Sequence, residues 1–292
     1  MREYDYIIAD VRIRCSHDLI ALGLNGFKPF AVDTDASSPY TTISLHNSAA
    51  PNTDGVVIER SHLSETNNES TLLRTIDGYA YTIERNDIGG HKASFHINTN
   101  NNHIDCYIAL RDSIDRAILR FGLWVMFGIV IAPLRGIAIH SSAIAFRDRA
   151  ALFLGESGTG KSTHTRLWRE CIEGAHLLND DSPIVRIIDG TPYVYGSPWS
   201  GKTPCYINKR LPIAGIVRLS QAPHNKMRRV NAIMAIGTLL PSCPYIFAKD
   251  EVLQDEICET LGEVIAHTSV YTLECLPDKA AAELSCKTLY VL

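Results

Sequence analysis

Alternating apolar and polar positions dominate the first part of the chain. Runs such as YDYIIADVRIR, TTISLH, GVVIER, YAYTIER and CYIAL have the period of two that is typical of half-buried β-strands. Turns containing Asn, Asp, Ser and Gly separate these runs, and a polar tip from Asn98 to Asp105 joins two of the strands. The pattern therefore predicts a β-rich N-terminal domain over residues 1–112.

A nearly continuous apolar segment follows, from Ser113 to Ile131. It is apolar on almost every side, which is typical of a helix packed between two layers, and Ser113 is placed to cap its N-terminus. The most apolar part, Phe121 to Gly136, is shorter than the roughly 20 residues of a membrane-spanning helix, and Pro133 interrupts it. We expect a buried core helix at the joint between two domains, and no membrane association.

From Gly136 onward, the pattern mixes strands and helices. Strands are expected in GIAIHSSAIAF, AALFL, AHLLNDDSPIVRII, TPYVYG and IAGIVRLS. Helical spacing occurs in STHTRLWRECIEG, VNAIMAIGTLL, DEVLQDEICETLGEVIAH and PDKAAAELSCKTL, where Pro277 suits a helix start. We expect residues 113–292 to form an α/β domain behind the β-rich one.

Composition narrows the classes of function. The 292 residues are 46% hydrophobic and 21% charged, as in a soluble globular protein, and the net charge is −4 at pH 7. This acidic balance argues against a general binder of nucleic acid or membrane surfaces, because such proteins are usually basic. The eight cysteines are scattered with no C-x-x-C pair, and no apolar secretory segment opens the chain. We expect a cytoplasmic protein with reduced thiols.

One motif indicates the chemistry. The segment ALFLGESGTGKSTHTRLW contains the G-x-x-x-x-G-K-[ST] pattern of a phosphate-binding loop, between an apolar strand and a helix. Glycines let successive backbone N–H groups converge on phosphate oxygens, and the helix N-terminus adds its positive dipole end. Lys161 brings a charge to the β- and γ-phosphates, and Ser162 supplies a hydroxyl ligand for Mg²⁺. We therefore expect ATP and Mg²⁺ as cofactors, held by Gly155, Glu156, Ser157, Gly158, Thr159, Gly160, Lys161, Ser162 and Thr163.

A pair of adjacent acids, Asp180 and Asp181, follows the apolar strand HLL a short distance after this loop. A hydrolytic switch or a transporter ATPase typically has a longer separation and one metal-binding acid. Two adjacent carboxylates suggest a division of labour, in which one contacts the Mg²⁺ shell and the other accepts a proton from an attacking hydroxyl. Mutual repulsion also raises the pKa of one of two neighbouring carboxyl groups, which suits a base near neutral pH. The structural alternative is an Asp-Asp-Ser-Pro turn.

These motifs together resemble a known family. The string AIHSSAIAFRDRAALFLGESGTGKSTHTRLW, followed by LLNDDSPIV, is similar to the kinase domain of the HPr kinase/phosphorylase family. That family shares its phosphate-loop fold with phosphoenolpyruvate carboxykinase. The resemblance is clear over residues 136 to about 190 and weaker from there to about 290. It implies an α/β core like that of HPr kinase and the carboxykinase, behind the β-rich N-terminal domain.

The resemblance also implies roles for single residues. His140 would lie near the transferring phosphate, and Lys161 and Ser162 would hold phosphate and Mg²⁺. The acid pair would provide the base and the metal-shell acid, for which we assign Asp180 and Asp181 respectively, although the sequence leaves this order open. The proposed catalytic residues are therefore Asp180, Lys161 and His140, and the proposed metal ligands are Ser162 and Asp181.

The chain departs from the family after the acid pair. The HPr enzymes carry an L-E-I-R-G stretch there, whose Glu helps hold Mg²⁺ and whose Arg acts in phosphate removal, whereas this chain has YVYGSPWSGKTPCYIN. It is more similar to the diverse HPr-kinase-like proteins, some of which are linked with pathways that phosphorylate a peptide serine. Relatives with this core often form rings, so the resemblance also implies a homo-oligomer.

Two further segments carry candidate binding residues. In GSPWSGK, Lys202 could reach a phosphate or an acidic substrate group and Trp199 could shape the acceptor pocket; the alternative is a tight turn with Trp199 packed on the core. In HNKMRRVN, Arg228 or Arg229 could stabilise charge on the transferring phosphate, because arginine binds phosphate bidentately. The alternative for this run is a solvated face.

The sequence thus predicts an ATP- and Mg²⁺-dependent kinase that transfers the γ-phosphate to a hydroxyl, with a serine of a protein or peptide as the expected acceptor. Three alternatives stay open. A small-molecule kinase or a carboxykinase-like enzyme would use the same core. A nucleotide-hydrolysing switch would release phosphate without an acceptor, and a non-catalytic ATP-binding module would only order a partner surface.

Overall fold

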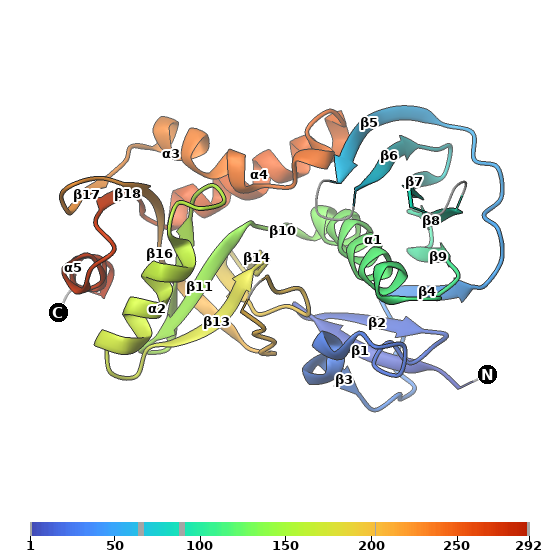
Figure 1. Ribbon diagram of the computed structural model, residues 1–292, viewed down its shortest axis with the longest axis horizontal. Helices are drawn as coiled ribbons and strands as arrows, with labels where there is room; N and C mark the ends of the chain where they lie inside the picture. The colour runs from blue at the N-terminus through green and yellow to red at the C-terminus, as the bar shows by residue number, and fades with distance from the viewer. Residues whose placement is uncertain (1, 64–66, 88–90, 202, 291–292) are drawn as a thin grey trace. The chain divides into compact units, whose positions relative to one another are not determined.

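The protein is a mixed α/β protein with two large mixed sheets, as shown by a computed structural model that describes residues 2–63, 67–87, 91–201 and 203–290 (Figure 1). The chain divides into two compact units. The first consists of Met1–Pro133 with Ile246–Gln254, and the second of Leu134–Tyr245 with Asp255–Leu292. Each unit is described separately below.

The first unit is built on a mixed sheet, which confirms the expectation of a β-rich N-terminal region. Its strand order is β3-β1-β2-β4-β9-β8-β7-β6-β5, and β4 runs parallel to both β2 and β9 while the other pairs are antiparallel. The polar tip joins β8 to β9, as expected. The bounds are β1 Tyr4–Ile8, β2 Val11–Cys15, η1 Asn25–Phe30, β3 Ala31–Val32, β4 Thr41–His46, β5 Val56–Leu63, β6 Asn68–Arg74, β7 Gly78–Arg85, β8 His91–Asn98 and β9 His103–Tyr107.

Helix α1 (Ser113–Ile131) has the predicted bounds, but its N-cap differs from expectation. Asp112, rather than Ser113, is the N-cap, because its side chain accepts a hydrogen bond from the backbone N–H of Asp115 at 2.9 Å. The helix packs on β7 and β8, where Gly122 leaves room for the ring of Phe95. The helix is part of the first compact unit, whose N-terminal segment runs to Pro133.

The segment Ser113–Leu134 passes a length-and-composition test for a membrane span, with a mean hydropathy of 2.0 over its most apolar window. However, 67% of that window is buried inside the protein. Helices at the centre of folded domains pass the same test, so this segment is accounted for as the core helix that the sequence predicts.

The second unit contains a sheet of order β10-β14-β15-β16-β12-β11-β13, with β18 paired to β16 and β17 paired to β18. Strand β16 is parallel to β12 and to β18, and the other pairs are antiparallel. The bounds are β10 Gly136–Ala138, β11 Ser141–Phe146, β12 Arg149–Leu154, β13 His176–Asp181, β14 Ile184–Ile188, β15 Thr191–Tyr195, β16 Arg210–Gln221, β17 Lys226–Arg229 and β18 Val270–Cys275.

Two predictions for this unit need correction. The segment GIAIHSSAIAF is two strands, since the chain leaves β10 before His140 and re-enters the sheet at Ser141 as β11. The run HNKMRRVN contains strand β17, which the charge pattern concealed, and β18 was not predicted. Helices α2 Lys161–Cys171, α3 Ala232–Leu239 and α5 Lys279–Tyr290 and the 3₁₀ turn η3 Leu240–Ser242 lie in this unit. The turns η2 Ala132–Leu134 and η4 Tyr245–Phe247 and the helix α4 Glu251–His267 contain residues of both units.

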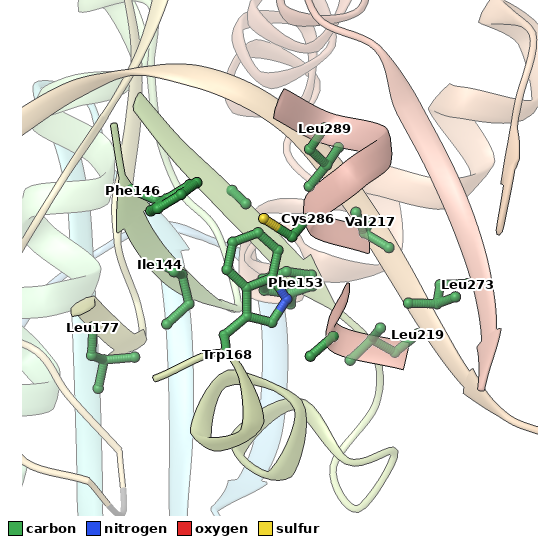
Figure 2. Close-up of a cluster of buried hydrophobic side chains, with 12 residues drawn as sticks. Ile144, Phe146, Phe153, Trp168, Leu177, Val217, Leu219, Leu273, Cys286 and Leu289 are labelled. Carbon is green, nitrogen blue, oxygen red and sulfur yellow. The ribbon is translucent and has the colours of Figure 1, made fainter. Parts of the chain in front are cut away.

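Helices α2 and α5 pack against each other, α2 on β11, β12 and β13 and α5 on β16. A buried apolar cluster fills the space between the helices and the sheet, and Figure 2 shows Trp168 at its centre beside Phe153. Burial of this aromatic and aliphatic surface is the main term that stabilises the unit. It also fixes α2, and with it the glycine-rich loop that precedes α2, against the end of β12.

The same interior contains a buried histidine that makes stability depend on pH. His164 Nε2 lies 3.0 Å from Ser285 Oγ and accepts a hydrogen bond from Trp168 Nε1 at 3.3 Å. Burial lowers the pKa of His164 to about 4, so the folded protein keeps it neutral while the unfolded chain binds a proton below its ordinary value of 6.5. Stability is therefore lost as the pH falls from 6.5 to 4, by about 3 kcal/mol at the lower limit.

Urea unfolding of the wild type and of His164→Gln at pH 7, 5.5 and 4.5 measures this contribution. We expect the variant to lose less stability than the wild type across that range. Substitution of the exposed His176 by Gln is the matched control. We expect it to leave the pH dependence of the free energy of unfolding unchanged. An equal pH dependence of stability in the wild type and in His164→Gln contradicts the conclusion that His164 causes this loss.

Candidate functional site

The glycine-rich loop connects β12 to α2 and requires backbone conformations that favour glycine. Gly155, Gly158 and Gly160 have φ values of +148°, +85° and +102°, in the region that L side chains rarely adopt. A Cβ at Gly155 would also clash with the side chain of Thr159, whose Oγ1 donates to the carbonyl oxygen of Glu156 at 2.8 Å. Helix α2 begins at Lys161, so the loop lies over the positive end of the helix dipole.

Lys161 turns its ammonium back over this loop. Its Nζ donates to the carbonyl oxygens of Gly155 at 2.6 Å and Glu156 at 3.2 Å, and lies 3.1 Å from His140 Nε2. Burial lowers the pKa of Lys161, and the carboxylates of Asp181 and Asp180 oppose that shift. The loop, the lysine and both predicted acids therefore form one electrostatic group.

His140 links the lysine to the acid pair. It lies in the break between β10 and β11, where its backbone N–H donates to the carbonyl oxygen of Ser242 at 2.7 Å. Its Nδ1 is 3.3 Å from Asp181 Oδ1, and its Nε2 faces the ammonium of Lys161. A neutral ring that accepts from the ammonium through Nε2 carries its proton on Nδ1, toward the carboxylate. The residues thus form a continuous chain from Asp181 through His140 to Lys161.

The two aspartates occupy different environments. Asp180 is only 5% exposed, and its Oδ1 accepts a hydrogen bond of 2.6 Å from Ser142 Oγ on the neighbouring strand β11. The side chain of Asp181 is 46% exposed and contacts His140. One carboxylate is therefore oriented inside the protein, while the other is accessible from solvent.

The backbone beneath the pair is held by the segment that follows β15. The carbonyl oxygen of Asp180 accepts from Ser200 Oγ at 3.0 Å and from the N–H of Gly201 at 2.7 Å. The buried side chain of Asn179 donates to the carbonyl oxygen of Trp199 at 3.1 Å. These bonds attach the GSPWSG segment to the end of β13, and explain why the Asp-Asp-Ser-Pro sequence is more than a surface turn.

Asp181 has a backbone φ of +114°, a conformation that is strained for any residue except glycine. An isolated bridge to Ser200 and the hydrogen bonds of the preceding residue keep it there. Because the surrounding structure imposes this conformation on a residue whose side chain contacts His140, the strain coincides with the centre of the site.

Sequence reasoning missed two residues of β16 that contact the loop. Arg218 is the register partner of Leu154, the residue before the loop, and its Nη2 lies 3.7 Å from Glu156 Oε1. Gln221 Nε2 donates to the carbonyl oxygen of Gly158 at 3.1 Å. The available signal was the single charge within the apolar strand IAGIVRLS, because a charge at such a position needs a partner.

A cavity of about 520 Å³ opens beside the loop and the first turn of α2. The glycine-rich loop forms one part of its wall. Apolar residues at the ends of β16 and β18, and in the segment between β18 and α5, form another part. It is lined by Gly158, Thr159, Gly160, Thr163, His164, Leu219, Gln221, Ala222, Cys275, Leu276 and Pro277. Concave sites of this size and mixed lining suit small organic ligands.

Of the remaining predicted residues, Trp199, Arg228 and Arg229 are described by the structure and are not brought together with this group. Trp199 is 4% exposed and lies in the interior, as the packing alternative proposed. Arg228 and Arg229 are exposed on β17, opposite Thr272 and Tyr271 of β18. Lys202 lies outside the described residues.

The exposed side of the loop carries Glu156, Ser157 and Ser162, with Thr163 half-buried. Within the described ranges, no group of three or more His, Cys, Asp and Glu side chains is placed to hold a metal ion. A divalent ion held here would need further oxygen ligands in addition to the side chains present, such as those that Mg²⁺ commonly obtains from phosphates and water.

The comparisons with known proteins find little. No protein-family model matches the sequence, and no curated protein matches it. Among solved structures, the structure of the Hpr(Ser) kinase/phosphatase from Coxiella burnetii is similar over 51% of this chain and 91% of that chain, with a TM-score of 0.30 and 11% sequence identity. The similarity is weak and concerns part of the fold at most.

Proposed function

We propose that this protein is a kinase that uses ATP and Mg²⁺ and transfers the γ-phosphate to a hydroxyl group. The observation that carries the proposal is the convergence, at one glycine-rich loop, of the ammonium of Lys161 with the carboxylate of Asp181 through His140. A binding module needs the cation and the loop alone. A carboxylate in the same group is what transfer to a hydroxyl additionally requires.

Triphosphate binding follows from the loop and its surroundings. The positive-φ glycines and the start of α2 provide backbone N–H groups and a positive dipole end for phosphate oxygens. Lys161 exchanges one of its loop carbonyl partners for a phosphate oxygen. The cavity beside Gly158–Gly160 and Thr163 takes the nucleoside, since apolar Leu219 and Leu276 can cover a base.

For Mg²⁺, the chain offers the hydroxyl of Ser162 at the start of α2 and the carboxylate of Asp180 at the end of β13, on which α2 packs. Mg²⁺ neutralises charge on the phosphates of the substrate. The burial of Asp180 and its bond from Ser142 suit a fixed ligand of the metal shell, whereas Asp181 is accessible to an acceptor. We therefore propose the reverse of the sequence-based order, with Asp181 as the base.

In the proposed transfer, the acceptor oxygen forms a bond to the γ-phosphorus. The bond from that phosphorus to the β–γ bridging oxygen breaks, and ADP leaves with the electron pair. The hydroxyl proton passes to the carboxylate of Asp181, whose orientation His140 maintains. Lys161 stabilises the charge that develops on the phosphate oxygens.

The acceptor is proposed only as a class, a serine of a protein or peptide, and the resemblance seen in the sequence supports it. The test incubates the purified protein with γ-labelled ATP, Mg²⁺ and a peptide library with serine, threonine or tyrosine as the single hydroxyl. A parallel reaction contains EDTA, and another omits the peptides. We expect label on serine peptides, none with EDTA, and little free phosphate without an acceptor.

Each other result points to another function. Rapid release of labelled phosphate without peptides identifies a hydrolysing switch. If no peptide is labelled, but small molecules are labelled when a cell extract replaces the peptides, the protein is a small-molecule kinase. Binding of ATP with neither transfer nor hydrolysis identifies a non-catalytic module and contradicts the proposal.

A further inference from the structure

Strand β16 brings a second cation to the loop. Arg218 is set in an otherwise apolar stretch of that strand, and β16 lies parallel to β12, with Arg218 opposite Leu154. Its side chain is 23% exposed. Since Gly155 follows Leu154 directly, the strand register places this guanidinium at the beginning of the glycine-rich loop.

Two contacts orient the guanidinium. Nη1 donates to the carbonyl oxygen of Thr238 in α3 at 3.2 Å, which holds one side of the fork against the last turn of that helix. Nη2 lies 3.7 Å from Oε1 of Glu156, a loop residue whose side chain is 85% exposed. An ion pair this long and this exposed contributes little free energy. An anion with higher charge can therefore replace the Glu156 carboxylate.

The position along β16 indicates which part of a nucleotide the arginine meets. Gln221, further along the strand, contacts Gly158 and lines the cavity that takes the nucleoside. Arg218 instead faces Glu156. The carbonyl oxygens of Gly155 and Glu156 accept hydrogen bonds from the ammonium of Lys161. The lysine at this position of the motif binds the β- and γ-phosphates. The beginning of the loop is therefore the terminal-phosphate end of the site.

The arginines that the sequence suggested are less well placed. Arg228 and Arg229 lie on β17, and two strands, β18 and β16, separate β17 from β12. The charge of Arg218, by contrast, is close enough to contribute to the lowered pKa of Lys161, after the larger effect of burial.

We propose that Arg218 binds the terminal phosphate of the nucleoside triphosphate, exchanging the carboxylate of Glu156 for γ-phosphate oxygens, and so selects ATP over ADP. The guanidinium fork matches two phosphate oxygens at once. In transfer, the same contact stabilises charge on the moving phosphoryl group. This inference rests on the proposed function, because it requires a triphosphate at the loop.

Calorimetric titration of ATP and ADP into the wild type, Arg218→Ala and Arg218→Lys tests the proposal. We expect Arg218→Ala to weaken ATP binding by about 10- to 100-fold, as for loss of a charge-assisted hydrogen bond. ADP binding changes by less than about threefold, because ADP lacks the contacted group. Arg218→Lys gives an intermediate loss, since it keeps the charge without the fork.

Arg166→Ala is the matched control, because Arg166 is exposed on α2 and pairs with Glu170 away from the loop. It leaves both affinities unchanged. Equal weakening of ATP and ADP by Arg218→Ala, or no weakening, overturns the inference. Loss of the preference for ATP in Arg228→Ala instead of Arg218→Ala also overturns it. Failure of the wild type to bind ATP contradicts the proposed function itself, so the two failures are distinguishable.

A second variant keeps the inference testable if Arg218→Ala does not fold. Glu156→Gln removes the carboxylate that competes for the guanidinium and leaves the arginine in place. We expect ATP to bind about two- to fivefold more tightly, in line with the small value of an exposed pair, with a smaller change for ADP. Unchanged or weaker ATP binding in Glu156→Gln overturns the proposal that Arg218 exchanges the Glu156 carboxylate for phosphate oxygens.

Discussion

We expect replacement of Asp181 by glycine to leave the protein at least as stable as the wild type and to remove the proposed phosphoryl transfer. The backbone of Asp181 has a φ of +114°, which glycine adopts without strain. Relief of about 1–3 kcal/mol of strain exceeds the added entropy of glycine in the unfolded chain, for a net gain of about 1 kcal/mol. The lost contact with His140 joins two half-exposed groups and subtracts little.

Activity falls because the proposed base is gone. We expect a decrease of about 10²- to 10⁴-fold in the rate of label transfer from ATP, the usual contribution of a positioned general base. Urea unfolding and the transfer assay on the same preparation measure the two effects. A rise in stability with loss of activity is what distinguishes a strained functional residue from a structural one.

The chain offers a matched control for this substitution. Asp189 also has a positive φ, +48°, but lies in the exposed turn between β14 and β15. Asp189→Gly changes the same side chain at another positive-φ position, and we expect it to leave transfer unchanged. Full activity in Asp181→Gly contradicts the proposed role of Asp181 as the base. A marked loss of stability contradicts the inference that glycine relieves backbone strain at this position.

We expect replacement of Lys161 by alanine to abolish the proposed transfer for a different reason. Its ammonium contacts the loop and His140 and interacts electrostatically with the acid pair. Without this ammonium, the negative charge of a phosphate at the loop would lack its nearest positive charge. We expect a decrease of about 10²- to 10³-fold or more in the transfer rate, as for loss of one preorganised donor, together with weaker ATP binding. Stability changes little, because the charge that burial penalises is removed along with its hydrogen bonds.

Calorimetry with ATP and the labelled-transfer assay provide the two measurements for Lys161→Ala. Lys287→Ala, which removes an exposed lysine from the last turn of α5, is the control for loss of a positive charge and leaves both unchanged. Normal transfer by Lys161→Ala would show that the loop does not hold the reacting phosphate.

Local features of this protein could be predicted from the sequence because neighbouring residues determine them. The positions of Gly155, Gly158 and Gly160 already indicated a backbone that only glycine adopts readily, and all three have positive φ values. The apolar run of α1 predicted its bounds correctly, since helical hydrogen bonds join residues four apart. The alternating pattern likewise predicted a β-rich first region.

Strand order could not be predicted in this way. Strand β11 lies between β12 and β13, so Ser142 reaches Asp180 and His140 lies between Lys161 and Asp181. Hydrogen bonds between strands that are distant in sequence determine this order, and periodicity carries no record of which strands pair. The sequence could therefore place the acids after the loop but could not distinguish the buried Asp180 from the exposed Asp181.

The arginines show most clearly the difference between what the sequence predicts and what the tertiary structure determines. Arg218, Arg228 and Arg229 stand close together in the chain, and the sequence favoured the adjacent pair. Only the parallel pairing of β16 with β12 brings Arg218 to the loop, while β17 pairs at the far side of β18. The sequence by itself determined the loop and the residue types that a phosphate site needs. The tertiary structure decided which of these residues meet, because side-chain contacts depend on strand pairing over long separations.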